Sequence, residues 1–389
     1  MSNGAVPRAL HAAALGLSLL VVFLLASTSG CGGGGAVHDG GNDTRPDGGP
    51  APDAPGEAAA SSWSHVEDAL ARAAEAAGPG AAFGLTVWDN ADRRVFERMV
   101  GGFTPDRRVA IASASKMISG LVIFESVRRG ELSLEATTGE VLGWTGANAS
   151  ITMRHLLSFT SGLGREALCT VNPLVTLATC VERIRDAPVV APPGTRFDYG
   201  STHLHVAARM AEVAAGKTWA QLFDEALRVP LGLPPEVAYF TAPKQATGVI
   251  NPLIAGGLRA SMNEYAPMLA LVYHHGAFGG RIVGTRALFQ EQTREPFPDV
   301  VIGQSPVADI GLSARYGLTA WLMCDTPAAG CASISSPGAF GFTPWLDREA
   351  GYYAILGMEL PRDTADSGVV DFAVKLQQEL APLVAAQVR

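Results

Sequence analysis

The chain has 389 residues, of which 48% are hydrophobic, and its formal net charge is −8. A domain of this length can bury a sizeable hydrophobic core without structural metal ions. The acidic balance argues against nucleic acid as a partner, because phosphate binding needs clustered Lys and Arg. Lysine is so rare that the position of each one is informative: Lys116, Lys217, Lys244 and Lys375.

Residues 1–31 have the pattern of an export signal. Arg8 precedes the apolar run ALHAAALGLSLLVVFLLA, and the small residues STSG lead to Cys31. This end resembles a bacterial lipoprotein signal, whose cysteine is lipidated after cleavage, although Thr28 stands where leucine is usual. The alternative is an uncleaved membrane anchor. Either one predicts a body in the cell envelope, and with lipidation it is anchored at the periplasmic face of a membrane.

Residues 32–60 are rich in Gly, Pro, Asp and Ala and lack apolar periodicity. This composition is typical of a flexible tether. The domain proper is therefore expected to span residues 61–389.

Cysteine usage agrees with an oxidising compartment, because lipidation of Cys31 leaves an even four. The short spacings favour two disulfides, Cys169–Cys180 and Cys324–Cys331. A zinc site is the weaker alternative, because neither pair has the short gap of a zinc knuckle. We expect no metal or other cofactor.

From residue 61 the pattern becomes globular. The expected elements, in chain order, are a helix at 61–77, strands at 81–89 and 93–100, a buried helix at 115–129, a mostly helical stretch at about 130–300, strands at 316–323, 338–347 and 351–358, and a helix at 366–388. Strands stand at both ends and helices lie between them. We therefore predict an α+β fold in which both termini form one antiparallel sheet, helices cover its two faces, and a helical region is inserted.

The stretch VAIASASKMISG, residues 109–120, places Ser113 three positions before Lys116 at the start of a helix. Ser113 alone could be a helix cap, but the residue that assists a cap three positions later is Glu or Gln. A cation there opposes the helix dipole. Residues three apart share a helix face, and the positive helix end and burial both favour a neutral amine. We therefore expect Lys116 to take the proton of Ser113 and make it a nucleophile.

A second motif, Tyr199-Gly200-Ser201, precedes an amphipathic helix. With the Ser-x-x-Lys motif, and with MRHLLSFTSGLG (153–164) and residues 254–283, it resembles the serine β-lactamase and penicillin-binding protein superfamily. The resemblance covers about residues 62–389. It is closest to the branch of class C β-lactamases, D-alanyl-D-alanine peptidases and family VIII carboxylesterases.

The third motif of that superfamily is Lys, His or Trp, then any residue, then Gly. We align it with Ser336-Pro337-Gly338, where no lysine or histidine stands. In the family this cation helps to hold a substrate carboxylate, so its absence favours uncharged esters. An arginine elsewhere would fill the vacancy, and Arg315 is one candidate.

The resemblance implies a serine hydrolase that acts on small-molecule esters or amides through an acyl-enzyme. Ser113 is the nucleophile, Lys116 the base and Tyr199 the proton relay. The substrate contacts and the oxyanion donors are expected from Ser201, Ser336, Gly338, Ala339 and the Ser113 backbone. Neutral carboxylic esters are favoured. The alternatives are β-lactamase or D-Ala-D-Ala carboxypeptidase activity, or a non-catalytic penicillin-sensing or binding module.

One pattern resembles a further catalytic motif, Ser261-Met262-Asn263. Because Glu264 stands three positions after Ser261, we interpret it as a capping box instead.

Overall fold

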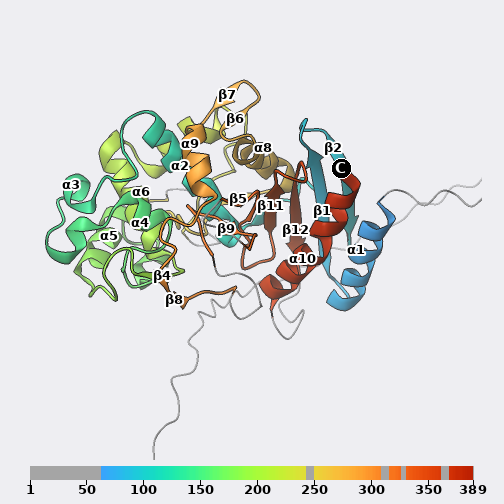
Figure 1. Ribbon diagram of the computed structural model, residues 1–389, viewed down its shortest axis with the longest axis horizontal. Coiled ribbons are helices and arrows are strands. Elements are labelled where there is room, and N and C mark those ends of the chain that lie inside the picture. The colour runs from blue at the N-terminus through green and yellow to red at the C-terminus, as the bar shows by residue number, and fades with distance from the viewer. Residues whose placement is uncertain (1–62, 242–248, 308–314, 326–329, 361–367, 389) are drawn as a thin grey trace, which may run out of the picture. The chain divides into compact units, whose positions relative to one another are not determined.

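The computed structural model describes residues 63–241, 249–307, 315–325, 330–360 and 368–388. These residues belong to one compact unit spanning residues 57–389 (Figure 1). The predicted signal and tether, with Cys31, lie outside the described residues.

A six-stranded antiparallel sheet joins the two ends of this unit, in the order β2-β1-β12-β11-β10-β9. Its strands are β1 Ala82–Asp89, β2 Arg94–Val100, β9 Trp321–Leu322, β10 Ser333–Ser335, β11 Thr343–Asp347 and β12 Tyr352–Glu359. The N-terminal β1 pairs with the C-terminal β12 along its whole length, with Leu85 opposite Leu356. The predicted α+β fold with both termini in one sheet is confirmed.

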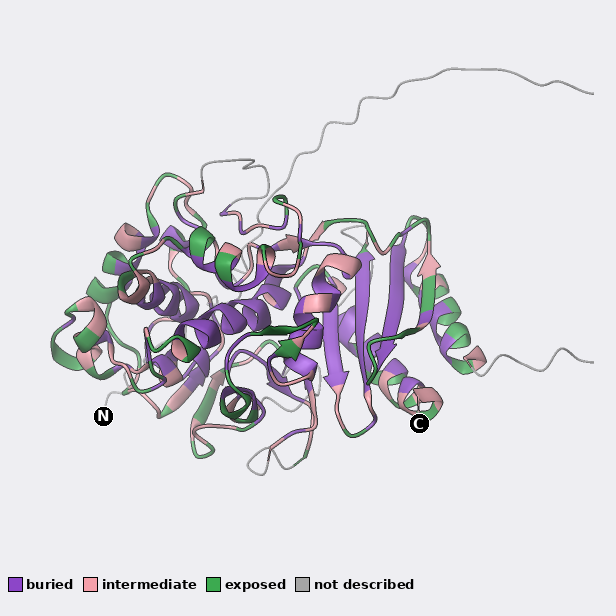
Figure 2. Cartoon of the chain, turned by 90° about the horizontal axis from the view of Figure 1, so that it is seen from above, coloured by how far each residue is buried: buried purple, intermediate pink, exposed green. Residues whose placement is uncertain are grey.

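Helices cover both faces of the sheet. On one face, α1 Ser64–Ala77 and α10 Val369–Val388 pack on β1 and β12 and bury one apolar cluster with them. On the other face, α8 Met262–Tyr273 crosses β11 and β12. A Cβ on Gly357 would lie 2.8 Å from the Met262 side chain, so this glycine permits the close approach. Strands β1, β11 and β12 are buried along nearly their whole length, whereas the edge strand β2 is largely exposed and α1 and α10 expose their outer sides (Figure 2).

The central helix α2, Ser115–Arg128, is buried at every position from Ser115 to Ser126. It lies between the sheet and a helical region that includes α3 Thr138–Leu142, α4 Met153–Leu157, α5 Leu177–Asp186, α6 Thr202–Ala215, α7 Trp219–Phe223 and α9 Arg286–Gln292. No helix within the described ranges is long and apolar enough to span a membrane.

Short strand pairs and single turns connect these helices. They are β3 Val109–Ala110 with β5 Arg259–Ala260, β4 Arg196–Asp198 with β8 Val301–Gln304, β6 Ala277–Phe278 with β7 Arg281–Ile282, and the helical turns Ala112–Ala114, Gly146–Ser150, Leu168–Val171 and Asp224–Arg228.

Side-chain caps fix where several helices begin. Capping boxes start α3, α4, α7 and α8, and the last of these confirms the predicted box of Ser261 and Glu264. The Ser261 hydroxyl accepts a hydrogen bond from the Glu264 backbone N–H, and the Glu264 carboxylate accepts one from the Ser261 N–H. Each box satisfies backbone donors that the first helical turn leaves without partners.

Two predicted strands were wrong in extent. Only Trp321–Leu322 of the strand predicted at 316–323 is a strand, because Thr319 has φ 62° and interrupts extended backbone. The strand predicted at 338–347 begins at Thr343, because a turn precedes it: Gly338 N–H donates to the Phe342 carbonyl at 2.8 Å, and Gly341 has φ 91°.

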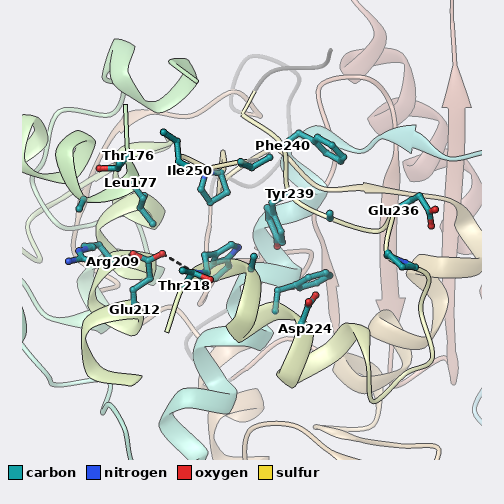
Figure 3. Close-up of a pocket in the computed structure, with 18 residues that line it drawn as sticks. Thr176, Leu177, Arg209, Glu212, Thr218, Asp224, Glu236, Tyr239, Phe240 and Ile250 are labelled. Atoms are coloured by element: carbon teal, nitrogen blue, oxygen red, sulfur yellow. Dashed lines mark hydrogen bonds and ion pairs between the residues drawn. The ribbon is translucent and has the colours of Figure 1, made fainter. Parts of the chain in front are cut away.

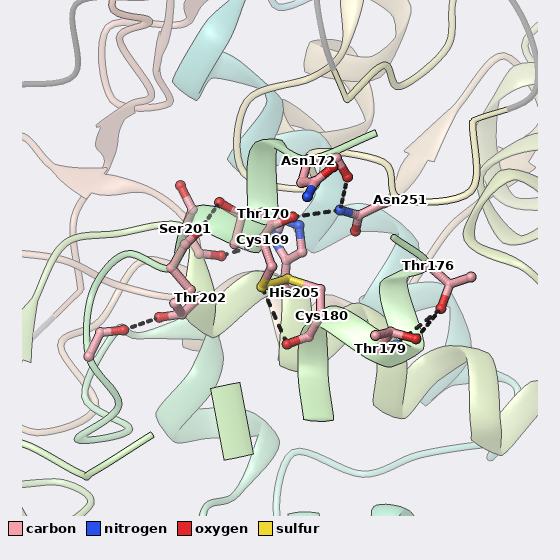
Figure 4. Close-up of a disulfide and its surroundings, with 12 residues drawn as sticks. Cys169, Thr170, Asn172, Thr176, Thr179, Cys180, Ser201, Thr202, His205 and Asn251 are labelled. Carbon is pink, nitrogen blue, oxygen red and sulfur yellow. Dashed lines mark hydrogen bonds between the residues drawn. A yellow bond between two sulfur atoms is a disulfide. The ribbon is translucent and has the colours of Figure 1, made fainter. Parts of the chain in front are cut away.

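The structure contains disulfides Cys169–Cys180 and Cys324–Cys331. Figure 4 shows the first of them beside His205 and Asn251. The Asn251 side chain donates to the Cys169 carbonyl at 2.7 Å, which ties this disulfide loop to the segment before β5.

Candidate active site

Ser113 lies in the single helical turn directly before α2. It does not cap this helix, because no side-chain cap hydrogen bond is found at either helical start. Ser115 supports the turn instead, since its hydroxyl donates to the Ala112 carbonyl at 2.6 Å. Ala112 has φ 46°, a left-handed conformation that costs a non-glycine residue about 1–3 kcal/mol and that is typical of functional sites. The Ser113 hydroxyl therefore remains available to a catalytic partner.

Lys116 supplies that partner from one turn further along α2. Its Nζ lies 3.0 Å from Ser113 Oγ and donates to the Ala255 carbonyl at 2.9 Å. The side chain is buried, and no ion pair involving it is found among the described residues. Its remaining neighbour is the Tyr199 ring, whose centroid is 4.5 Å from Nζ. A lysine nitrogen over a ring face is in the geometry of a cation–π contact.

Tyr199 follows β4 and comes to the site from the helical region. Its backbone N–H donates to the Gln304 carbonyl at 2.8 Å. The ring stacks on Trp321 of β9, with centroids 5.1 Å apart, and meets the edge of Phe159 at 5.2 Å. Aromatic contacts of this kind hold the ring beside Lys116, so the structure brings the three predicted catalytic residues together.

A buried histidine fixes the backbone behind Tyr199. In α6, His203 Nδ1 lies 2.8 Å from Ser161 Oγ and Nε2 lies 2.8 Å from the Asp198 carbonyl. Burial lowers the pKa of His203 to about 4, so the ring is neutral at pH 7. Its two hydrogen bonds therefore link the segment around Ser161 to the segment that carries Tyr199. Within the described ranges no group of three or more His, Cys, Asp or Glu side chains is placed to hold a metal ion.

The third predicted motif directly follows β10. The Ser336 hydroxyl donates to the Ser113 carbonyl at 3.0 Å, so this residue braces the nucleophile's backbone. A Cβ on Gly338 would lie 2.1 Å from the Ile111 carbonyl, so only glycine permits this approach. Ala339 is exposed, and its N–H has no hydrogen-bond partner among the described residues.

A cavity of about 260 Å³ opens beside Ser113. The described residues that line it are Ser113, Arg165, Glu166, Tyr199, Gln304, Ser305, Pro306, Val307, Trp321, Pro337, Ala339 and Val370. Lys116 therefore lies behind the wall rather than in it. The two charged side chains of the lining are Arg165 and Glu166, which no sequence motif singled out.

One predicted contact differs from expectation and one stays untested. The hydrogen bonds of Lys116 Nζ among the described residues go to Ser113 and Ala255, and the substrate contact predicted for Ser201 stays a prediction. Arg315 pairs with Glu295 at 2.9 Å and is not part of the cavity wall. The sequence suggested Arg315 because it precedes a predicted strand. The ion pair with Glu295, which is 20 residues earlier in the chain, could not be inferred from that position.

A larger cavity, of about 780 Å³, lies between α5, α7 and the segment around Tyr239 (Figure 3). Ser113, Lys116 and Tyr199 are absent from the described residues that line it. Tyr239 points its hydroxyl away from this cavity to Ser119 of α2, at 2.8 Å. The three residues predicted to be catalytic therefore lie at the smaller cavity and not at the larger one.

Known proteins are similar to this chain in sequence and in fold. A family model described as "Beta-lactamase" matches residues 66–359. The chain is 30% identical to penicillin-binding protein 4 of Amycolatopsis lactamdurans over 190 residues, 47% of this chain and 49% of that protein. It is 25% identical to esterase EstB of Burkholderia gladioli over 309 residues, 64% of this chain and 77% of that protein.

Among solved structures, a putative β-lactamase from Bacteroides dorei is similar with a TM-score of 0.72 and 28% identity, over 83% of this chain and 98% of that chain. The chain spans about half the length of the penicillin-binding protein that it matches. The family model covers most of the compact unit, from α1 to the end of β12. This chain therefore belongs to the beta-lactamase family of serine hydrolases, to which an esterase and a penicillin-binding protein are also similar.

Proposed function

We propose that this protein hydrolyses carboxylic esters through an acyl-enzyme at Ser113. Ser113 Oγ bonds to the substrate carbonyl carbon, and its proton passes to Lys116. As the carbonyl carbon–alkoxide bond breaks, Tyr199 gives its proton to the leaving oxygen and regains one from Lys116, and water later hydrolyses the acyl-enzyme to release the acid. The observation that carries this proposal is the 3.0 Å contact between Lys116 Nζ and Ser113 Oγ, with the Tyr199 ring 4.5 Å from the same nitrogen.

The oxyanion of the tetrahedral intermediate would bind between two backbone N–H groups, those of Ser113 and Ala339. Both residues line the cavity, and Ala339 N–H is free of other partners among the described residues. Pro337 cannot serve, because proline has no N–H. Each such donor typically contributes about 2.7–4 kcal/mol to catalysis.

Within this chemistry we favour neutral carboxylic esters as substrates. The end of β10 carries Ser336 instead of a cation, and its hydroxyl is engaged with the Ser113 carbonyl. A carboxylate beside the scissile bond would find no charged partner on this strand. The similarity to an esterase along 77% of that relative also supports this choice.

The main alternative is β-lactamase or D-Ala-D-Ala carboxypeptidase activity, which the similarity to a penicillin-binding protein favours. A non-catalytic penicillin-sensing module on the same fold is a further alternative. It would acylate without turnover or not react at all.

One comparison separates these possibilities. We expect the protein to be labelled by a fluorophosphonate and to turn over p-nitrophenyl butyrate, and Ser113→Ala to abolish both. Labelling with a fluorescent penicillin and hydrolysis of nitrocefin are measured in parallel. If kcat/KM for nitrocefin exceeds that for the ester tenfold or more, the ester preference is wrong. Ester turnover by Ser113→Ala would refute the nucleophile.

We also propose that the protein is exported and held at the membrane through a lipid on Cys31, with no other membrane contact. The apolar run before Cys31 and the two disulfides of the compact unit support this proposal. Incorporation of labelled palmitate into the protein, and its loss in Cys31→Ala, would test it. Palmitate incorporation by the variant would refute lipidation at this cysteine.

A further inference from the structure

Arg165 enters the catalytic cavity from the loop that follows α4. Its backbone is fixed against the Tyr199 motif: the Arg165 carbonyl accepts hydrogen bonds from Ser201 N–H at 2.9 Å and from Thr202 N–H at 3.3 Å. A Cβ on Gly200 would lie 2.0 Å from this carbonyl, so the two segments are in direct backbone contact. The backbone of Arg165 is therefore held in place by the segment that directly follows Tyr199.

The guanidinium of Arg165 has no ion pair or hydrogen bond among the described residues, although it lines the cavity. Arginines on neighbouring segments are paired, Arg196 with Asp198 at 2.7 Å and Arg315 with Glu295 at 2.9 Å. Arg165 is thus an exposed cation in the wall of the cavity that Ser113 also lines, and it has no ion-pair partner among the described residues.

We propose that Arg165 binds a carboxylate of the substrate, at a part of the molecule remote from β10. The planar guanidinium presents paired donors that match a carboxylate, and such charge-assisted bonds are the strong ones. This inference rests on the proposed ester hydrolysis and limits the preference for a neutral substrate to the part of the molecule beside β10. The favoured substrates are neutral where they face Ser336 and carry a carboxylate on the loop side, as in monoesters of dicarboxylic acids or esters of hydroxy acids.

Glu166 is the other charged residue of the lining, and it has the opposite effect on an anion. Its carboxylate repels a substrate carboxylate bound at Arg165. Neutralising Arg165 should therefore weaken the binding of a substrate carboxylate, and neutralising Glu166 should strengthen it. Arg281 of the β6–β7 hairpin gives a matched control, because it is an exposed arginine that makes no ion pair among the described residues and does not line this cavity.

The test compares esters that differ only in the charge of one group. In the first pair the variable carboxylate is on the leaving group: 4-acetoxybenzoate is anionic and methyl 4-acetoxybenzoate is neutral. In the second pair it is on the acyl part: the mono-4-nitrophenyl ester of adipate is anionic and the 4-nitrophenyl ester of monomethyl adipate is neutral. The measured quantity is the ratio of kcat/KM for the anionic ester to that for its neutral counterpart.

For at least one pair we expect Arg165→Gln to lower this ratio about five- to twentyfold, as for a charge-assisted bond at an exposed side chain. Arg165→Lys should retain part of the ratio, and Glu166→Gln should raise it. Arg281→Gln should leave it unchanged. Equal losses for both members of each pair in Arg165→Gln, or no change in either ratio, would overturn the carboxylate site.

Failure of the proposed ester hydrolysis would give a different result from failure of the carboxylate site. If the parent hydrolyses neither p-nitrophenyl butyrate nor any of these four esters, ester hydrolysis is refuted. Arg165 is then judged by the second-order rate of covalent labelling with a fluorescent penicillin, which carries a carboxylate, against that with a neutral fluorophosphonate. The same selective loss in Arg165→Gln supports the site, and an unchanged ratio overturns it.

Discussion

Replacing Gly338 by alanine tests how closely the third motif must approach the nucleophile. The new Cβ would lie 2.1 Å from the Ile111 carbonyl and 3.2 Å from the Phe342 carbonyl. Both neighbours are backbone atoms, so the turn after β10 must move away from the segment that leads to Ser113. Ala339 directly follows Gly338, and its N–H is the proposed oxyanion donor. We expect kcat for p-nitrophenyl butyrate to fall about 100- to 1,000-fold, which corresponds to about 2.7–4 kcal/mol for one lost donor.

The same variant should lose about 1–3 kcal/mol of stability through overpacking, measured by urea unfolding. Gly164→Ala is the matched control. A Cβ there meets nothing within 4 Å, and its φ lies outside the left-handed region, so we expect kcat within about twofold and a slightly raised stability. A folded Gly338→Ala protein whose kcat stays within about threefold of the parent would refute the idea that this close approach positions the oxyanion donor.

Three further outcomes are expected. Lys116→Ala should slow fluorophosphonate labelling about 100- to 10,000-fold, and labelling at the parent rate near neutral pH would exclude Lys116 as the base. Replacing Cys169 and Cys180 by serine should lower the free energy of unfolding by about 3 kcal/mol, and an unchanged urea midpoint would contradict this loop-closure effect. Burial lowers the pKa of His203 and His205 from 6.5 to about 4, so the unfolded chain takes up protons first as the pH falls. Each of these two histidines should therefore lower the free energy of unfolding by about 2 kcal/mol at pH 5 relative to pH 7.5. Equal urea midpoints at the two pH values would refute the burial argument.

Local geometry explains how the sequence could predict the Ser113–Lys116 pair. Residues three apart at a helix start must share a face, and the fold added only the short turn that frees the serine from capping. Tyr199 is different, because nothing local links it to Lys116. Its place followed from the resemblance to a family, and the aromatic contacts with Trp321 and Phe159 that hold its ring could not be inferred from spacing.

The parts of the site that sequence reasoning missed depend on tertiary contacts. The apolar pattern of GAFGFTPWLD predicted a strand from Gly338, but the Gly338–Phe342 hydrogen bond closes a turn and leaves Phe340 53% exposed. Arg165 carries no periodic or motif signal. It reaches the cavity only because its carbonyl is bonded to the backbone of the segment after Tyr199.

Distant chain segments meet at Ser113 through backbone atoms more than through side-chain pairs. Ser336 binds the Ser113 carbonyl, and Lys116 binds the Ala255 carbonyl. Backbone carbonyls accept hydrogen bonds whatever the side chain at their own position, so residues such as Ala255 can vary without loss of the bond. The reacting pair, in contrast, is set within a single helical turn. We therefore expect substitutions at exposed cavity residues such as Arg165 and Glu166 to alter substrate choice while the distance between Ser113 and Lys116 is kept.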